Sequence, residues 1–464
     1  MAASIANGQA HANGQRNGVT PNVNAVKNMP FYKPTPPDIT MSNLHEGDKH
    51  MILFRNVNIF DSTGADPYPG DVLIEGQRIK SVGKFDFCPD SDTLVIDGHG
   101  TKTLMSGLVD AHTHLSWCNA STMQGLTSLP LEEHVLHTAR FAKMYLDCGY
   151  TMCFGAASAH PRMDISIKNG ISSGLIPGPR TLANCQEIAT TGGAIVPSIS
   201  RFADGADEVR KVVREFISLG ADNIKLNMTG DYAHPTMGAE ETYVTLAETR
   251  AAVEEAHNRG KRICSHARSA ASVTMSCLTG MDVIYHGSYV DAEGLEMLEI
   301  LKDRVFVAPA INFLVSTCDG DGASFGLTAE MAKKRGMGDE LEKACAAMNE
   351  LRRRGVRVLP GGDYGFAWVP HGTYARDLAH FVNLFGYTPK EALIAATAMG
   401  GELMGHPQEL GKVQPGYYGD VILVDGNPLD NVELFQDTAN LHAIVINGHV
   451  HKNVTGPGQV SKLT

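Results

Sequence analysis

One local pattern repeats along most of this 464-residue chain and limits how it can fold. An amphipathic helix ends at a glycine, and a short apolar strand follows at once. Strands of this kind are expected to begin near Tyr150, Ala221, Lys261, Met281 and Val356. Glycine suits the left-handed residue just past a helix. Alternating helices and strands predict an α/β fold with a parallel sheet, and a closed (β/α)8 TIM barrel over residues 106–410 fits best.

The helix before Gly220 shows the pattern most clearly. Its apolar side chains recur at helical spacing and form a single stripe, made of Val209, Val212, Val213, Phe216 and Ile217. Such a stripe predicts a helix with one face packed on the sheet. The third and seventh strands are less distinct, and we place them at residues 179–183 and 305–308.

The two ends of the chain share a different pattern. Short β-branched runs, punctuated by Gly and Asp, occupy residues 51–98 and return at 420–450. They predict strands of a small β-sandwich domain built from residues 51–105 and 411–464. Residues 1–50 are rich in Ala, Asn, Gly, Gln and Pro, and we expect a disordered or extended N-terminal tail.

Composition excludes several classes of partner. The net charge is -12 and no Lys/Arg run occurs, so we expect no nucleic-acid partner. The apolar runs are too short for a membrane span, so no membrane partner is expected either. Nine cysteines without a Cys-x-x-Cys pair, and no apolar signal core, favour a cytoplasmic location with reduced thiols.

Potential metal ligands stand at the ends of the predicted strands. An apolar run at residues 104–109 leads into Asp110-Ala111-His112-Thr113-His114. Residues two apart on a strand point to the same side, so His112 and His114 form a half-site for a divalent metal. Four more strands end similarly, with Lys225, His266, His286 and Asp363. In a barrel these ends meet at the C-terminal mouth, and core histidines would not fall there repeatedly.

These residues, with their neighbours, resemble the amidohydrolase superfamily. The similar branch contains imidazolonepropionase-like, prolidase-like and ochratoxinase-like amidases. The motifs are Gly-Leu-Val-Asp-Ala-His-Thr-His at 107–114, Ile-Lys at 224–225, Ser-His at 265–266, His-Gly-Ser-Tyr at 286–289, Gly-Asp at 362–363, Pro-His-Gly at 370–372 and the stretch 411–425.

The resemblance implies a binuclear site with two divalent metal ions, zinc by preference. His112 and His114 would bind one metal, and His266 and His286 the other. Lys225 would be carboxylated and bridge the two metals, since a lysine of depressed pKa can react with carbon dioxide. Asp363 would contact the first metal and shuttle protons as the catalytic acid and base. The alternative reading of Lys225 is a barrel lysine paired with an acid, but the other four ligand positions favour the bridge.

The activity implied by the resemblance is hydrolysis of an amide or cyclic amide C–N bond in a small molecule. A metal-bridging hydroxide would be the nucleophile. Alternatives are a deaminase or non-hydrolytic lyase on the same metal cage, and a non-catalytic scaffold of the same fold. The family also implies a homo-oligomer.

Residues near the predicted mouth are candidates for binding the substrate. Arg268 lies two residues past His266, and its guanidinium suits a carboxylate of an N-acyl amino acid or dipeptide-like substrate. The alternative is a surface arginine bonded to a neighbouring loop. Further candidates are Tyr232, His234, Tyr289 and His371. Aromatic residues in 364–369 would line a pocket for a ring-containing substrate, or simply pack the loop.

Overall fold

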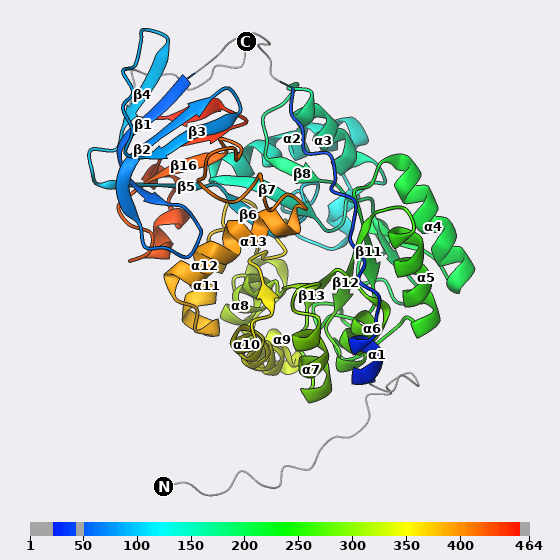
Figure 1. Ribbon diagram of the computed structural model, residues 1–464. Coiled ribbons are helices and arrows are strands. Elements are labelled where there is room, and N and C mark those ends of the chain that lie inside the picture. Colours follow the sequence, from blue (N-terminus) through cyan, green and yellow to red (C-terminus); the bar gives the residue numbers. More distant parts are fainter. Residues whose placement is uncertain (1–21, 43–50, 455–464) are drawn as a thin grey trace, which may run out of the picture.

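The computed structural model describes residues 22–42 and 51–454. It contains a barrel with its surrounding helices and, at the upper left of Figure 1, a separate sheet that joins strands from both ends of the chain. This is the α/β barrel with a terminal β domain that the sequence predicts. Among the described residues, no helix combines the length and the apolar composition needed to span a bilayer.

Parallel strands from two sheets form the barrel. They are β6 (Leu108–Thr113), β7 (Tyr150–Gly155), β8 (Arg180–Leu182), β11 (Asn223–Asn227), β12 (Arg262–Ala267), β13 (Val283–His286), β14 (Phe306–Ala308) and β15 (Arg357–Val358). Two backbone contacts link the sheets. The Ala111 N–H donates to the Pro360 oxygen at 3.0 Å, and the Asp222 N–H donates to the Ala183 oxygen at 2.8 Å. The predicted third and seventh strands are confirmed as β8 and β14.

Helices surround these strands. They are α2 (Leu131–Asp147), α3 (Met163–Ser172), α4 (Ala206–Leu219), α5 (Leu246–His257), α6 (Ala270–Thr279), α7 (Ala292–Ile300), α8 (Ile311–Asp319), α9 (Ala329–Arg335), α10 (Met337–Arg353), α11 (Arg376–Phe385), α12 (Pro389–Ala396) and α13 (Ala398–Leu403). The predicted stripe on α4 is confirmed, because its apolar side chains are buried except for the half-buried Ile217. Gly220 ends α4 with a φ of 107°, which glycine adopts without strain.

The terminal sheet unites the two ends of the chain. Its strands are β1 (Met51–Phe60), β2 (Tyr68–Glu75), β3 (Arg78–Gly83), β4 (Thr93–Asp97), β5 (Lys102–Ser106), β16 (Val421–Asp425), β17 (Leu441–Ile446) and β18 (His449–Asn453). β5 pairs with β1 and also with β16, so the C-terminal strands continue the N-terminal sheet. β6 follows β5 directly, and this connection leads from the terminal sheet into the barrel.

Residues 22–42, here called the N-terminal strap, lie along the barrel. The strap begins with α1 (Val23–Lys27) and then runs without regular structure past β11 and β12, as the dark blue segment of Figure 1 shows. Tyr32 stacks on His257 with ring centroids 3.5 Å apart, and the Ile39 oxygen accepts from Arg180 at 2.6 Å. This part of the predicted tail is therefore held against the barrel; the remainder of residues 1–50 lies outside the described residues.

Candidate metal centre

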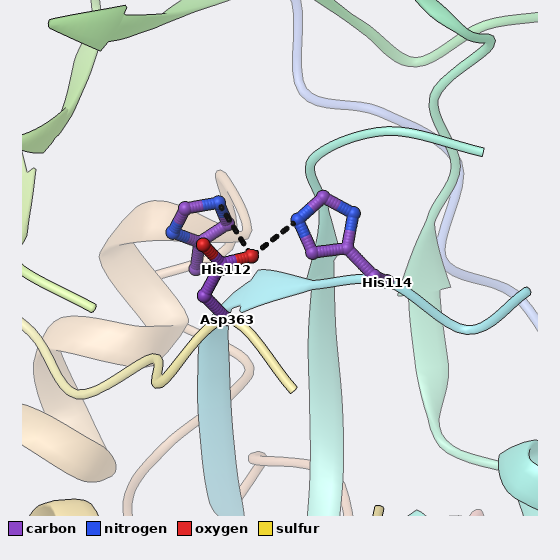
Figure 2. A group of neighbouring side chains, drawn as sticks. All are labelled: His112, His114 and Asp363. Atoms are coloured by element: carbon purple, nitrogen blue, oxygen red, sulfur yellow. Dashed lines mark ion pairs between the residues drawn. The ribbon is translucent and has the colours of Figure 1, made fainter. Parts of the chain in front are cut away.

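His112 and His114 at the end of β6 converge on Asp363, which follows β15 (Figure 2). Asp363 Oδ1 lies 3.0 Å from His114 Nε2 and 3.7 Å from His112 Nε2. A close approach of the two chain segments makes this possible. A Cβ atom on Gly361 would lie only 2.6 Å from the His112 nitrogen, so only glycine lets the segment pass beside β6.

The other three predicted ligands lie next to this group. Lys225 Nζ on β11 is 3.5 Å from His112 Nε2. His286 Nε2 at the end of β13 is 2.9 Å from His266 Nδ1 on β12. The His112 and His286 rings are 5.3 Å apart. The structure thus brings all six predicted side chains to one end of the barrel.

Two of these residues have left-handed backbones. The φ angles of His286 and Asp363 are 71° and 61°. Non-glycine residues seldom adopt such angles, and the strain persists where surrounding structure imposes it, often at functional sites. At His286 the conformation has a visible consequence. Tyr285 stacks on His112 inside the barrel, yet the next side chain also reaches the interior, against the alternation of a regular strand.

Neighbouring groups fix the orientation of the imidazoles. The His114 ring stacks on Trp117 with centroids 3.5 Å apart, and the His112 ring stacks on Tyr285 at 3.8 Å. His114 Nδ1 lies 2.9 Å from the Ala157 carbonyl oxygen. Because that oxygen can only accept, Nδ1 carries the proton and the lone pair of His114 is on Nε2. Such hydrogen bonds commonly orient metal-binding histidines.

The donor atoms fit a divalent cation. His114 Nε2 and Asp363 Oδ1 face each other, but neither has a hydrogen-bond partner among the described residues. His112 Nδ1 and His286 Nδ1 are also buried, and neither has a hydrogen-bond partner within residues 22–42 and 51–454. Two facing lone pairs in a buried site are costly unless a cation lies between them. Imidazole nitrogen and carboxylate oxygen are the ligands that zinc prefers in catalytic sites.

Burial also sets the protonation that metal binding requires. It lowers the pKa of His112, His266 and His286 well below the usual value for histidine, so the rings are neutral. Burial likewise lowers the pKa of Lys225. No carboxylate of the described residues lies within ion-pairing distance of Lys225 Nζ, so the structure gives no support to pairing with an acid. A lowered pKa favours the neutral amine that carboxylation needs.

A narrow cavity opens onto these residues. Its walls are largely apolar and aromatic, and two carboxylates interrupt them. The lining includes Trp117, Met123, Glu187, Ile195, Val196, Ile199, Asp231, Phe313 and Phe366. Phe366 lines the cavity, whereas Trp368 stacks behind it with centroids 4.8 Å apart. In the aromatic loop at 364–369, Phe366 thus fits the expected pocket lining, whereas Trp368 fits the expected packing of the loop.

Sequence reasoning missed the two cavity carboxylates. Glu187 lies on β9 (Glu187–Ala189), an added strand that pairs with β11, and its Oε1 accepts from Ser200 and Asn227. The available signal was an acid directly before Ile188 and Ala189, shortly after the third strand. Asp231 follows β11 by a few residues, but nothing in the local sequence shows that it faces the cavity.

Arg268 is buried rather than exposed. Its Nη1 lies 2.5 Å from Glu340 Oε1 on α10, and its Nη2 lies 2.5 Å from Asp231 Oδ2. Its Nε donates to His266 Nε2 at 3.4 Å. Both terminal nitrogens therefore already face protein carboxylates.

The other predicted substrate-binding residues lie outside the lining of this cavity. His371 is buried; its Nε2 donates to the Trp117 oxygen at 2.6 Å, and its Nδ1 lies 3.1 Å from the Tyr374 hydroxyl. Tyr232 and Tyr289 contact each other through their side chains. His234 is half-buried, and its Nδ1 accepts from the Thr236 N–H at 3.3 Å.

The fold and the site together define a (β/α)8-barrel enzyme with a candidate metal centre at its mouth. Residues 103–451 match the model of the amidohydrolase family, and the chain belongs to this family. It is a hydrolase acting on carbon–nitrogen bonds.

Several known proteins are similar to this chain. Ochratoxinase of Aspergillus niger is 25% identical over 389 residues, covering 78% of this chain and 77% of ochratoxinase. A solved amidohydrolase structure is 27% identical, with a TM-score of 0.77 over 87% of this chain and 99% of its own. A prolidase solved with N-methylphosphonate-L-proline shares the fold, at 24% identity and a TM-score of 0.78 over 87% of this chain and all of that one (100%).

Proposed function

We propose that this protein is a binuclear metal hydrolase that cleaves an amide or cyclic amide bond. The observation that carries the proposal is the position of Lys225. Its amine lies beside His112, and burial lowers the pKa of this amine. The facing atoms of His114 and Asp363 lie at the same end of the barrel. The His266–His286 pair lies there too. A carboxylated lysine at this point would place an anionic bridge between two sets of histidine ligands.

The residues divide into two ligand sets. His112 and His114 would hold one divalent ion, His266 and His286 the other, and carboxylated Lys225 would bridge them. When bound, two zinc ions would activate a water molecule and polarise the substrate carbonyl. Asp363 would complete the first set, take a proton at its carboxylate from the attacking water, and deliver that proton to the leaving nitrogen.

The cavity supports a substrate with a flat or bulky apolar group. Trp117, Phe313 and Phe366 provide aromatic walls close to the metal ligands, and aromatic rings favour stacked or edge-to-face partners. The proposed class of substrate is an N-acyl amino acid or dipeptide-like amide. A carboxylate on it would need a partner other than Arg268 unless Asp231 or Glu340 moves away, since both already face this guanidinium.

Metal analysis of the purified protein tests this proposal first. Plasma mass spectrometry should find about two zinc ions per chain, and chelation should remove the zinc together with activity on N-acyl amino acids and dipeptides. One metal per chain would contradict the Lys225 bridge. An ammonia-release assay separates a deaminase from most amidases, and ammonia as the main product would overturn the amide assignment.

The oligomeric state and the cellular location of the protein are also part of the proposal. We expect a homo-oligomer in the cytoplasm, a small-molecule substrate, and neither a nucleic-acid nor a membrane partner. Light scattering of the purified protein would check the first expectation.

A further inference from the structure

A second cavity lies at the opposite end of the barrel from the metal centre. Its volume is about 620 Å³. Residues 31–38 of the N-terminal strap form one wall, and the beginnings of β11, β12, β14 and β15 form the other. We call it the basal cavity. The strap passes over it without filling it, although Tyr32 and Thr35 hold the strap to the barrel.

The basal cavity collects positive charge in an acidic protein. The chain has a net charge of -12, yet seven Lys or Arg residues line this cavity against five Asp or Glu residues. Two of the acids face partners outside the lining. Asp222 pairs with Lys168 at 2.7 Å, and Asp282 contacts His257 at 2.9 Å. Arg259 likewise pairs outside the lining, with Glu255 at 2.9 Å, so cations still outnumber acids among the remaining lining residues.

Several of the cationic side chains lack a compensating acid. Among the described residues, Lys33, Lys261 and Lys412 have no ion-pair partner. Arg304 donates to the Met29 carbonyl oxygen at 2.8 Å, which leaves its charge unneutralised. Cations that outnumber the neighbouring acids repel one another, so an anion bound among them would be favourable.

Arg262 and Arg357 are the two cations best placed to bind an anion in the basal cavity. Both guanidiniums approach the Phe306 ring, at 5.6 and 3.9 Å from its centroid. They share one residue as partner. Arg357 Nη1 pairs with Glu402 Oε2 at 3.0 Å, while Arg262 Nη2 donates only to the Glu402 backbone oxygen at 3.2 Å.

The Glu402 carboxylate therefore pairs with Arg357 alone, and Arg262 has no ion-pair partner among the described residues. Arg262 Nη1 and Arg357 Nε have no hydrogen-bond partner among the described residues. Burial lowers the pKa of Arg262; the nearby Asp282 opposes this shift, and Arg357 adds to it. This shift agrees with a guanidinium whose charge is incompletely compensated.

We propose that the basal cavity binds a small dianion, carried as a phosphate or dicarboxylate group, at Arg262 and Arg357. Guanidinium forks match the oxygen spacing of both groups. The neighbouring lysines would add long-range attraction, and the strap would cover the bound anion. This site is independent of the proposed amide hydrolysis, because it lies at the other end of the barrel.

Titration calorimetry of the metal-loaded protein tests the proposal with inorganic phosphate and, separately, succinate at constant ionic strength. Arg357→Met and Arg262→Met should each weaken binding about tenfold or more, as expected for the loss of a charge-assisted contact. Arg201→Met is the matched control, because this half-exposed arginine pairs with Glu215 on the protein surface.

Arg357→Met also removes the ion pair with Glu402, so Lys412→Met provides a second variant that leaves this pair intact. Lys412 lines the cavity and has no ion-pair partner in the described part of the chain, so its replacement should weaken binding severalfold while unfolding is unchanged. Binding of phosphate alone or of succinate alone would each support the site and identify the anionic group. No saturable binding, equal weakening by Arg201→Met, or binding that persists in the Arg262 and Arg357 variants would overturn it.

Discussion

His114 Nε2 and Asp363 Oδ1 lie 3.0 Å apart, and each directs a lone pair at the other. The Ala157 carbonyl imposes this arrangement by holding the proton of His114 on Nδ1. Two acceptors in this position need a cation between them. The fold therefore places a candidate metal-binding pair at the mouth of the barrel.

Asp363→Asn tests the role of this carboxylate. An amide keeps one oxygen for metal contact but cannot accept the proton of the attacking water, so kcat should fall by about 10²- to 10⁴-fold. Metal content should fall less than activity does. Kinetics and metal analysis on the same preparation provide the measurement, and normal kcat with full metal content would contradict the assigned role.

Lys225→Ala should lose both metal and activity, because the bridge between the two ligand sets is removed. Addition of a short carboxylic acid such as acetate should restore part of the activity by occupying the vacated space. Lys211→Ala, on the exposed side of α4, is the control. Full activity with normal metal content in Lys225→Ala would refute the bridge.

Arg268→Ala distinguishes substrate recognition from positioning. Because both terminal nitrogens face Asp231 and Glu340, we expect kcat/KM to fall alike for acidic substrates and for their neutral amides. Removal of the guanidinium leaves two buried carboxylates unpaired, which should also lower stability by about 3–5 kcal/mol. A rise in KM confined to acidic substrates would instead establish the carboxylate-binding role expected from the sequence.

Phe366→Ala should change substrate preference rather than chemistry. Loss of an aromatic wall should raise KM about tenfold for amides with an aromatic acyl group, as expected from the lost ring burial and stacking. Small aliphatic amides should be affected little. Phe202→Ala, at a half-exposed phenylalanine on β10 (Ser200–Phe202), is the control. Equal KM changes for both substrate types would exclude Phe366 as a specificity determinant.

His371 should make stability depend on pH. Burial lowers the pKa of His371 to about 3, whereas in the unfolded chain it titrates near 6.5. Below that unfolded value only the unfolded state gains the proton, so stability falls as the pH falls. Between pH 7 and pH 5, His371 should lower the free energy of unfolding by about 2 kcal/mol.

His371→Gln should remove that share of the pH dependence. The measurement compares the free energy of urea unfolding at the two pH values for wild type, His371→Gln and His137→Gln, the last at an exposed position on α2. A pH dependence in His371→Gln as steep as that of wild type would show that His371 is not buried in its neutral form.

Much of the architecture is predictable from local patterns. Helical periodicity identified the buried face of α4, and glycine marked its end, because both depend on residues within a few turns of one another. The six candidate metal ligands were also found from sequence, since parallel strands place their carboxyl ends together.

The sequence by itself determined the alternation of helices and strands, the union of the two termini in one sheet, and the residue types at the strand ends. The tertiary structure alone decided which way His286 points, since its left-handed backbone overrides the alternation of the strand. It also decided that Arg268 pairs with Glu340, and that the strap crosses the barrel base. These features depend on segments far apart in the chain, and local periodicity carries no information about how such segments pack.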